Sequence, residues 1–397
     1  MASEFVPPLG FKAAGTHCGI KRAKKDLSLI VSDVPASAAG VFTTNRVIAA
    51  PVVLSRTNVA KRSGIRAIIT NSGNANACTG ELGDIAACTM SRETAAALGC
   101  RPDEVLVSST GVIGQPLPVE KIVDGLGAIV AELSADGFPS ATEGIMTTDT
   151  FPKYFSEQFP LGGKTITISG IAKGSGMIAP NMATMLGYVC TDANINNDTL
   201  QAMLSGATKQ TFNRITVDGD TSTNDMVLLL ANGAANGSEI FAGSSDAQTF
   251  TTHLESVCRS LAQSIVRDGE GANKFVAITV RGAVTEKDAE TAARSIAGSS
   301  LVKTAIHGED ANWGRIAAAV GYSGIDFAPE KMEILLGDVV MLAPPYRIDF
   351  SEAAAKEVLS KKDIDIIVDL HAGDAEATCW TCDLSKDYVH INASYRS

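Results

Sequence analysis

The sequence contains no apolar run long enough to cross a membrane and no segment typical of export. Nowhere do about 18 consecutive apolar residues occur, so we expect no transmembrane helix. Residues 1–11 include Glu4, Pro7 and Pro8 where a signal peptide needs an apolar core, so no signal peptide is expected. Eight cysteines in 397 residues are ordinary usage for a reducing compartment. We therefore expect a cytoplasmic protein without a membrane partner.

The chain also lacks an excess of basic charge. It carries 33 Lys and Arg residues against 44 Asp and Glu residues, which gives a formal net charge of −11. A chain of this charge repels phosphate backbones, so we expect no nucleic-acid partner. The dense basic run Lys21–Lys25 can form a local anion site. A solvated segment leading into the strand-like run Leu27–Val31 is the favoured interpretation.

The sequence motifs of several common enzyme classes are missing. There is no P-loop and no early Gly-x-Gly-x-x-Gly, which weakens a nucleotide-binding interpretation. The five histidines show no metalloprotease spacing, and no Gly-x-Ser-x-Gly elbow is present. The stretch Val217–Asp225 resembles a calcium loop but lacks the required Gly and Glu. The pair Cys379-x-x-Cys382 lies in a strand-like run without a second pair, so we expect neither a redox site nor a metal.

Strand and helix patterns alternate along the chain without a strict β-α-β rhythm. A length of 397 residues and a hydrophobic content of 45% suit two or three domains with a large core. Residues 163–172 alternate in polarity and predict a strand, whereas residues 198–212 and 246–267 have the apolar spacing of helices, with Asp198 as a candidate N-cap. From about residue 275 we expect a small α/β unit, with strands at 275–280, 364–370 and 377–384 and a helix at 351–361.

The most informative stretch runs from Lys173 to Leu186. Its glycines permit close backbone approach, and Thr184 opens an apolar run. If the Ala183–Thr184 bond were cleaved, the new α-amino group would have a pKa of roughly 7.7–8.0 and could act as the base for its own hydroxyl. On the local pattern alone, a Gly-rich loop that leads into a strand is the stronger interpretation.

Three further polar loops each allow a functional and a structural interpretation. Ser108–Gly114 follows an apolar run and can supply N–H and hydroxyl donors for an oxyanion hole, or form a simple turn. The amide-rich loop Asn71–Gly80 can bind a polar small molecule or satisfy its own backbone. Glu270, between two glycines, can present a carboxylate to a ligand amine, although the same glycines suit a helix C-cap.

Taken together, these motifs resemble the ornithine acetyltransferases of arginine biosynthesis, the glutamate N-acetyltransferase family. The resemblance covers nearly the whole chain, and its motifs occur in the family's order. They are residues 71–80, 109–114, 146–150, 173–186, 218–225, 268–272, 307–315 and 392–396. The family usually ends in Thr, whereas this chain ends in Ser397, which retains the hydroxyl.

The resemblance implies a self-processing acetyltransferase. Autocleavage between Ala183 and Thr184 would give an α chain, 1–183, and a β chain, 184–397, assembled as α2β2. Thr184 would take the acetyl group of N2-acetyl-L-ornithine and pass it to L-glutamate by a ping-pong mechanism, without a cofactor. The implied fold is α+β: an αββα-like layered sandwich of the N-terminal-nucleophile type, with the smaller C-terminal α/β unit.

The resemblance also assigns roles to individual residues. Thr110 and Gly111 match the positions that stabilise the oxyanion. The substrate-binding positions match Thr147, Lys173, Thr184, Glu270, Asn392 and Ser397. Lys173 can hold an α-carboxylate, and Glu270 can orient the ornithine amine and shuttle its proton. Bifunctional members also acetylate glutamate from acetyl-CoA, and no residue here separates them from monofunctional members.

Two alternatives remain open at this point. An aminopeptidase or amidase of the N-terminal-nucleophile type would resolve the acyl-enzyme with water instead of glutamate. An unprocessed amino-acid-binding protein would keep the fold with an inactive site. The first differs from a transferase in releasing ornithine without glutamate, and the second in keeping the chain uncleaved.

Overall fold

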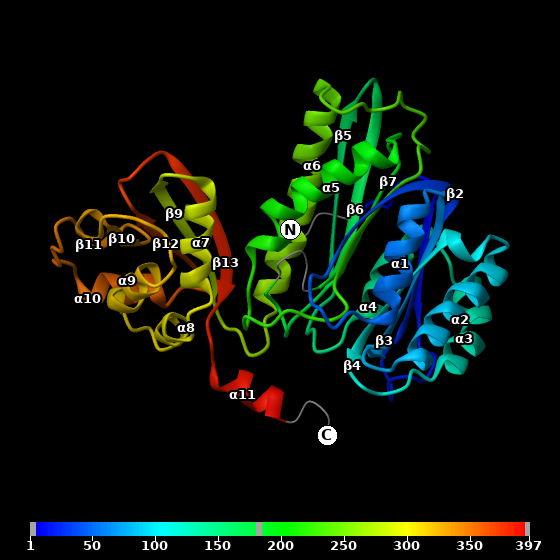
Figure 1. Cartoon of the computed structure of the whole chain (residues 1–397), viewed down its shortest axis with the longest axis horizontal. Helices are drawn as coiled ribbons and strands as arrows, with labels where there is room; N and C mark the ends of the chain where they lie inside the picture. The colour runs from blue at the N-terminus through cyan, green and yellow to red at the C-terminus, as the bar shows by residue number, and fades with distance from the viewer. Residues whose placement is uncertain (1–4, 180–184, 394–397) are drawn as a thin grey trace. The chain divides into compact units, whose positions relative to one another are not determined.

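The computed structural model describes residues 5–179 and 185–393, which form two compact units (Figure 1). The first unit contains residues 5–174, 185–213 and 220–265. The second contains residues 175–179, 214–219 and 266–393, so it begins before the expected boundary near 275 and takes in two short earlier segments. The division into α and β chains at Ala183 and Thr184 falls outside the described residues and stays a prediction.

The first unit is built on an eight-stranded sheet in the order β4-β3-β2-β8-β7-β6-β5, with β1 paired to β2. Its strands are β1 Phe11–Thr16, β2 Leu27–Phe42, β3 Ile65–Asn74, β4 Val105–Val112, β5 Lys153–Leu161, β6 Lys164–Lys173, β7 Leu186–Thr191 and β8 Met226–Ala231. The long strand β2 pairs with β3 over residues 27–31 and with β8 over residues 37–42. It therefore joins two halves of the sheet.

These two halves and their helices form four layers. Tyr188 on β7 lies in one core cluster with Ile68 of the other half, and its hydroxyl accepts a hydrogen bond of 2.9 Å from Thr70. The helices are α1 Ala50–Lys61, α2 Glu81–Leu98, α3 Val119–Ala131, α4 Phe138–Ile145, α5 Asn197–Gln210 and α6 Ser245–Arg267. Helices α2 and α3 cover the outer face of β3 and β4, and α5 and α6 cover the other half. The layers confirm the predicted αββα sandwich.

The second unit is smaller and also mixed. Its five-stranded sheet has the order β11-β10-β12-β9-β13, with β9 and β12 parallel. The strands are β9 Phe275–Ala283, β10 Glu333–Leu336, β11 Val339–Leu342, β12 Asp363–Asp369 and β13 Ala375–Cys382. The helices are α7 Glu286–Ala297, α8 Ser300–His307, α9 Trp313–Gly321, α10 Glu352–Leu359 and α11 Lys386–Ala393. Helix α7 packs on β9 and β13, as expected for a small α/β unit.

Two local predictions need correction. The N-cap of α5 is Asn196, whose side chain accepts a 3.0 Å hydrogen bond from the Thr199 N–H, whereas Asp198 is an exposed partner of Arg62. The expected turn after residue 107 is also wrong, because β4 continues to Val112 alongside β3. None of the helices that the structure describes is long and apolar enough to cross a bilayer.

Candidate active site

Thr110 and Gly111 lie near the carboxyl end of β4, where a buried strand reaches partial exposure. Gly111 pairs with Gly73 on the neighbouring strand and has a φ of 132°. A Cβ at Gly111 would lie 2.3 Å from the Gly73 carbonyl carbon, so only glycine fits this close approach. The end of β4 therefore lies in close contact with β3 at Gly111, and the oxyanion role of Thr110 and Gly111 stays a prediction.

Amide side chains form hydrogen bonds around the end of β4. The Asn224 amide donates to the carbonyl oxygens of Ser109, at 2.9 Å, and Ala75, at 2.5 Å. The Ser109 hydroxyl donates to Asn71 Oδ1 at 2.6 Å, and the Asn71 amide donates to the Asn74 carbonyl at 2.9 Å. These amides bond to their own surroundings, which favours the structural interpretation of residues 71–80. Their first part, moreover, belongs to β3.

Asp149 brings Thr147 and Lys173 together. Its Oδ1 accepts hydrogen bonds from Lys153 Nζ and from the N–H of Gly174, both at 2.7 Å. Its Oδ2 accepts one from the Thr147 N–H at 2.9 Å. Burial alone would raise the pKa of Asp149, but the charges of Lys173 and Lys153 and the hydrogen bonds hold it well below its usual range. One ionised carboxylate thus fixes both predicted substrate-binding positions.

Lys21 also binds the segment that precedes Thr147. Its Nζ donates to the carbonyl oxygens of Met146, at 2.6 Å, and Lys25, at 2.8 Å. Burial lowers the pKa of Lys21 to about 8, against the opposing effect of the Asp26 carboxylate. The expectation of a fully solvated basic run is therefore wrong at Lys21, although Arg22 is exposed. The supporting roles of Lys21 and Asp149 were not predicted from the sequence, because they depend on burial and on contacts that form only in the folded chain.

A second buried carboxyl group, that of Asp225, lies directly before β8. Asp225 is 3% exposed, and its Oδ2 has no hydrogen-bond partner among the described residues. Burial raises the pKa of Asp225 well above its ordinary value, despite the opposing Lys173 charge. The next residue, Met226, donates its N–H to the Met185 carbonyl at 3.1 Å. The proposed nucleophile, Thr184, and its neighbour Ala183 lie outside the described residues.

Glu270 and Asn392 meet within the second unit. The Asn392 amide donates to Glu270 Oε2 at 2.7 Å, and the Glu270 N–H donates to the Ser175 carbonyl at 3.0 Å. A Cβ at Gly176 would lie 2.3 Å from the carboxyl carbon of Glu270, so a larger residue there would displace this carboxylate. The structure therefore brings together these two predicted positions. The third predicted position near this end, Ser397, lies outside the described residues.

The loop that carries Glu270 is also fixed by the carboxylate of Asp383. Asp383 Oδ1 accepts hydrogen bonds from the N–H groups of Asn273, at 2.7 Å, and Lys274, at 2.9 Å. Asp383 Oδ2 lies 2.7 Å from His307 Nδ1. His307 opens the 307–315 motif, to which sequence reasoning gave no role. In the structure it braces the carboxylate that shapes this loop.

The other motifs weighed above have structural explanations. The Asp218 carboxylate accepts hydrogen bonds from the N–H groups of Met177, at 2.7 Å, and Ile178, at 2.8 Å, so it orders the segment that contains these two residues. Cys379 and Cys382 are both buried in β13. Burial raises the pKa of both thiols, that of Cys379 to about 11, which makes a reactive thiolate unfavourable.

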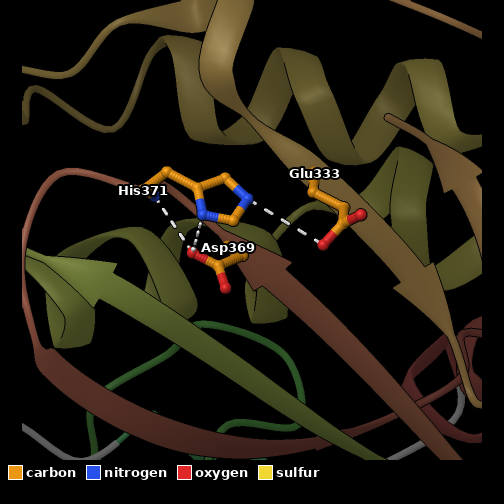
Figure 2. A group of neighbouring side chains, drawn as sticks. All are labelled: Glu333, Asp369 and His371. Atoms are coloured by element: carbon orange, nitrogen blue, oxygen red, sulfur yellow. Dashed lines mark hydrogen bonds and ion pairs between the residues drawn. The ribbon is translucent and has the colours of Figure 1, made fainter. Parts of the chain in front are cut away.

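Figure 2 shows a group of possible metal ligands in the described part of the second unit, Glu333, Asp369 and His371. His371 Nδ1 lies 3.3 Å from Asp369 Oδ1, and its Nε2 lies 3.9 Å from Glu333 Oε2. The Arg281 guanidinium donates to Asp369 Oδ2 at 2.7 Å. Asp369 thus pairs with the Arg281 guanidinium and lies beside His371, and Glu333 faces His371, so the cluster does not require a metal ion to explain it.

Comparison with known proteins agrees with this fold and these motifs. The layered sandwich and its small α/β unit define the fold class, and the ArgJ family model matches residues 12–397. The chain belongs to the ArgJ family, which confirms the resemblance. Arginine biosynthesis bifunctional protein ArgJ of Symbiobacterium thermophilum is 52% identical over 100% of this chain and 99% of its own, and that of Chlorobaculum tepidum is 52% identical over 98% and 96%.

Solved structures include relatives as well. The crystal structure of arginine biosynthesis bifunctional protein ArgJ from Bacillus halodurans is 47% identical, covers 52% of this chain and 98% of its own, and has a TM-score of 0.51. An ornithine acetyltransferase from Mycobacterium tuberculosis in complex with ornithine is 39% identical over 44% of this chain and 94% of its own, with a TM-score of 0.40.

Proposed function

We propose that this chain transfers the acetyl group of N2-acetyl-L-ornithine to L-glutamate in arginine biosynthesis. Membership of the ArgJ family over nearly the whole chain supports the proposal. The structural observation that carries it is the buried carboxylate of Asp149, which anchors both Thr147 and the end of the strand that carries Lys173. The resemblance assigns both of these positions to substrate.

Lys173 provides the recognition that a shared site needs. Donor and acceptor both carry an α-carboxylate, and one buried ammonium can bind each in turn through a charge-assisted hydrogen bond. Glu270, held by the Asn392 amide, provides a carboxylate for the amine of ornithine. A lysine for the α-carboxylate and a glutamate for the amine thus suit a site that binds two amino acids in turn.

The reaction has two balanced steps. The Thr184 hydroxyl attacks the acetyl carbonyl, an ester bond forms, the amide C–N bond breaks, and ornithine leaves with the hydroxyl proton. The amine of glutamate then attacks the ester, an amide C–N bond forms, the ester C–O bond breaks, and N-acetylglutamate leaves while the amine proton restores the Thr184 hydroxyl. The α-amino group freed by cleavage after Ala183 serves as the base, and Thr110 and Gly111 stabilise the tetrahedral oxygen. The chemistry uses no cofactor.

The proposal includes a second activity, the acetylation of glutamate from acetyl-CoA. The relatives are named bifunctional proteins, which supports this second activity. Both activities would share the acetyl-Thr184 intermediate. The proposal also includes an α2β2 assembly of the two processed chains and a cytoplasmic location, in line with a biosynthetic role.

A donor–acceptor assay tests the main activity. Purified protein is given N2-acetyl-L-ornithine with and without L-glutamate, and ornithine and N-acetylglutamate are measured. We expect ornithine release to depend on glutamate and to match N-acetylglutamate formation. Equal ornithine release without glutamate would identify an amidase instead. Denaturing electrophoresis gives a separate check, because the active sample should contain chains 1–183 and 184–397.

A further inference from the structure

A pocket of about 550 Å³ lies at the end of β2 in the first unit. It is lined by residues 40–42 of β2, residues 43–46 and Ile48 of the following loop, Arg56 from α1, and Gln201 and Ser205 from α5. Its volume falls within the range of roughly 300–1,000 Å³ that is typical of small-molecule sites. Neither the predicted catalytic positions nor the predicted substrate positions line this pocket.

The pocket is cationic, although the chain as a whole carries a net charge of −11. Arg46 and Arg56 both line it, and none of its lining residues is acidic. Arg56 lies with its guanidinium carbon 5.4 Å from the centroid of the Phe42 ring and donates to the Thr43 carbonyl at 3.4 Å. Neither arginine forms an ion pair with a carboxylate in the described part of the chain. Two exposed guanidinium groups are suited to bind phosphate oxygens.

The register of the sheet relates this pocket to Lys173. Phe42 pairs with Met226, Met226 with Leu186, and Leu186 with Lys173, so the four residues form one row across β2, β8, β7 and β6. Three strand spacings of roughly 4.8 Å separate the ends of this row by about 14 Å. A ligand that reaches from the pocket to Lys173 must therefore be long.

Acetyl-CoA has the required form, because a flexible arm separates its thioester from a phosphate-rich nucleotide end. We propose that the Arg46–Arg56 pocket binds the phosphate end of acetyl-CoA and that the thioester end reaches toward Lys173, at the other end of this row. This inference rests on the proposed second activity. The Thr184 hydroxyl would attack the thioester carbonyl, the ester C–O bond would form, the C–S bond would break, and coenzyme A would leave as the thiol with the hydroxyl proton.

The two acetyl donors allow a sharp test. N-acetylornithine has no phosphate and does not need the pocket, so only the acetyl-CoA reaction should depend on the arginines. In the processed enzyme, Arg46→Gln and Arg56→Gln should each raise the KM for acetyl-CoA about tenfold, the lower end of what a charge-assisted hydrogen bond contributes. The kcat at saturating acetyl-CoA should be unchanged, and transfer from N-acetylornithine should stay within about twofold of wild type.

The control variant removes cations elsewhere in the same unit. Arg22 and Lys24 are exposed and belong to the basic run, and the double variant Arg22→Gln/Lys24→Gln should leave the KM for acetyl-CoA unchanged. An unchanged KM in the Arg46 and Arg56 variants, or an equal rise in the control, would overturn the assignment. Equal losses with both donors would also overturn it, because they indicate a structural effect.

Direct binding separates this inference from the proposed function. Coenzyme A is titrated calorimetrically into wild-type enzyme and into the Arg46→Gln/Arg56→Gln variant, and we expect binding that the variant loses. Transfer from N-acetylornithine without any coenzyme A binding would keep the proposed main activity and refute the pocket. Arginine-dependent coenzyme A binding without transfer from either donor would support the pocket and refute the proposed function.

Discussion

We expect the substitution Asp149→Asn to lower both the stability of the first unit and its binding of substrate. The carboxylate accepts hydrogen bonds from Lys153 and Gly174 on Oδ1 and from Thr147 on Oδ2, and the side chain of Lys153 is fully buried. Asparagine keeps one acceptor oxygen and places an amide donor opposite an existing donor. Removing one partner of a buried ion pair costs about 3–5 kcal/mol. We expect the free energy of unfolding at pH 7 to fall by this amount.

The same substitution should affect substrate binding. With the anchor lost, Thr147 and Lys173 are no longer held at a fixed spacing, and a displacement of about 1 Å can reduce the rate by roughly 100-fold. We expect the KM for both N-acetylornithine and glutamate to rise. Because the folded pKa of Asp149 lies below its unfolded value, the stabilisation is present above about pH 4 and is lost as the pH falls.

Urea unfolding between pH 3 and 7 and steady-state kinetics at pH 7 measure the two effects. Lys153→Met is the matched control, since it breaks the same buried pair but leaves the bonds from Thr147 and Gly174 to Asp149 intact. It should lower stability and leave both KM values near wild type. The reasoning is refuted if Asp149→Asn leaves both KM values unchanged, or if the control raises them equally.

Two further substitutions test other parts of the account. The pKa of Asp225 is raised in the folded protein, so its carboxyl group stabilises the fold in its neutral form. The free energy of unfolding of the wild type should therefore fall by up to about 1.4 kcal/mol per pH unit as the pH rises above the unfolded pKa near 3.9. In urea unfolding, Asp225→Asn should remove this slope. Parallel pH profiles would contradict the burial of a neutral carboxyl group. Gly176→Ala places a Cβ 2.3 Å from the carboxyl carbon of Glu270 and should lower kcat/KM for N-acetylornithine at least tenfold. Gly127→Ala, which meets nothing within 4 Å, is its control and should keep full activity.

Periodicity was sufficient to predict some of the regular elements. Strand β6 and helix α6 follow from the alternation at 163–172 and the apolar spacing at 246–267. The ends of elements depend on tertiary pairing and were predicted less well. Residues 108–112 carry turn-forming side chains, yet they continue β4 because β3 supplies a hydrogen-bonding partner along their length.

The candidate site was predicted from family motifs, and the residues that support it in the structure were not predicted. Lys21 contacts Met146 across 125 positions of sequence, and no local pattern indicates that contact. Asp149 lies inside the quoted 146–150 motif, but its role depends on burial between Lys153 and Gly174. His307 likewise gains its role through its contact with Asp383, which lies 76 residues further along the chain.

The most direct test of the central claim examines residue 184. The enzyme is incubated with N2-acetyl-L-ornithine in the absence of glutamate and then analysed by mass spectrometry. The account predicts a chain that begins at Thr184, carries one ester-linked acetyl group on that residue, and loses the group when glutamate is added. An active sample with the bond from Ala183 to Thr184 intact, or full transfer by Thr184→Ala, would contradict it.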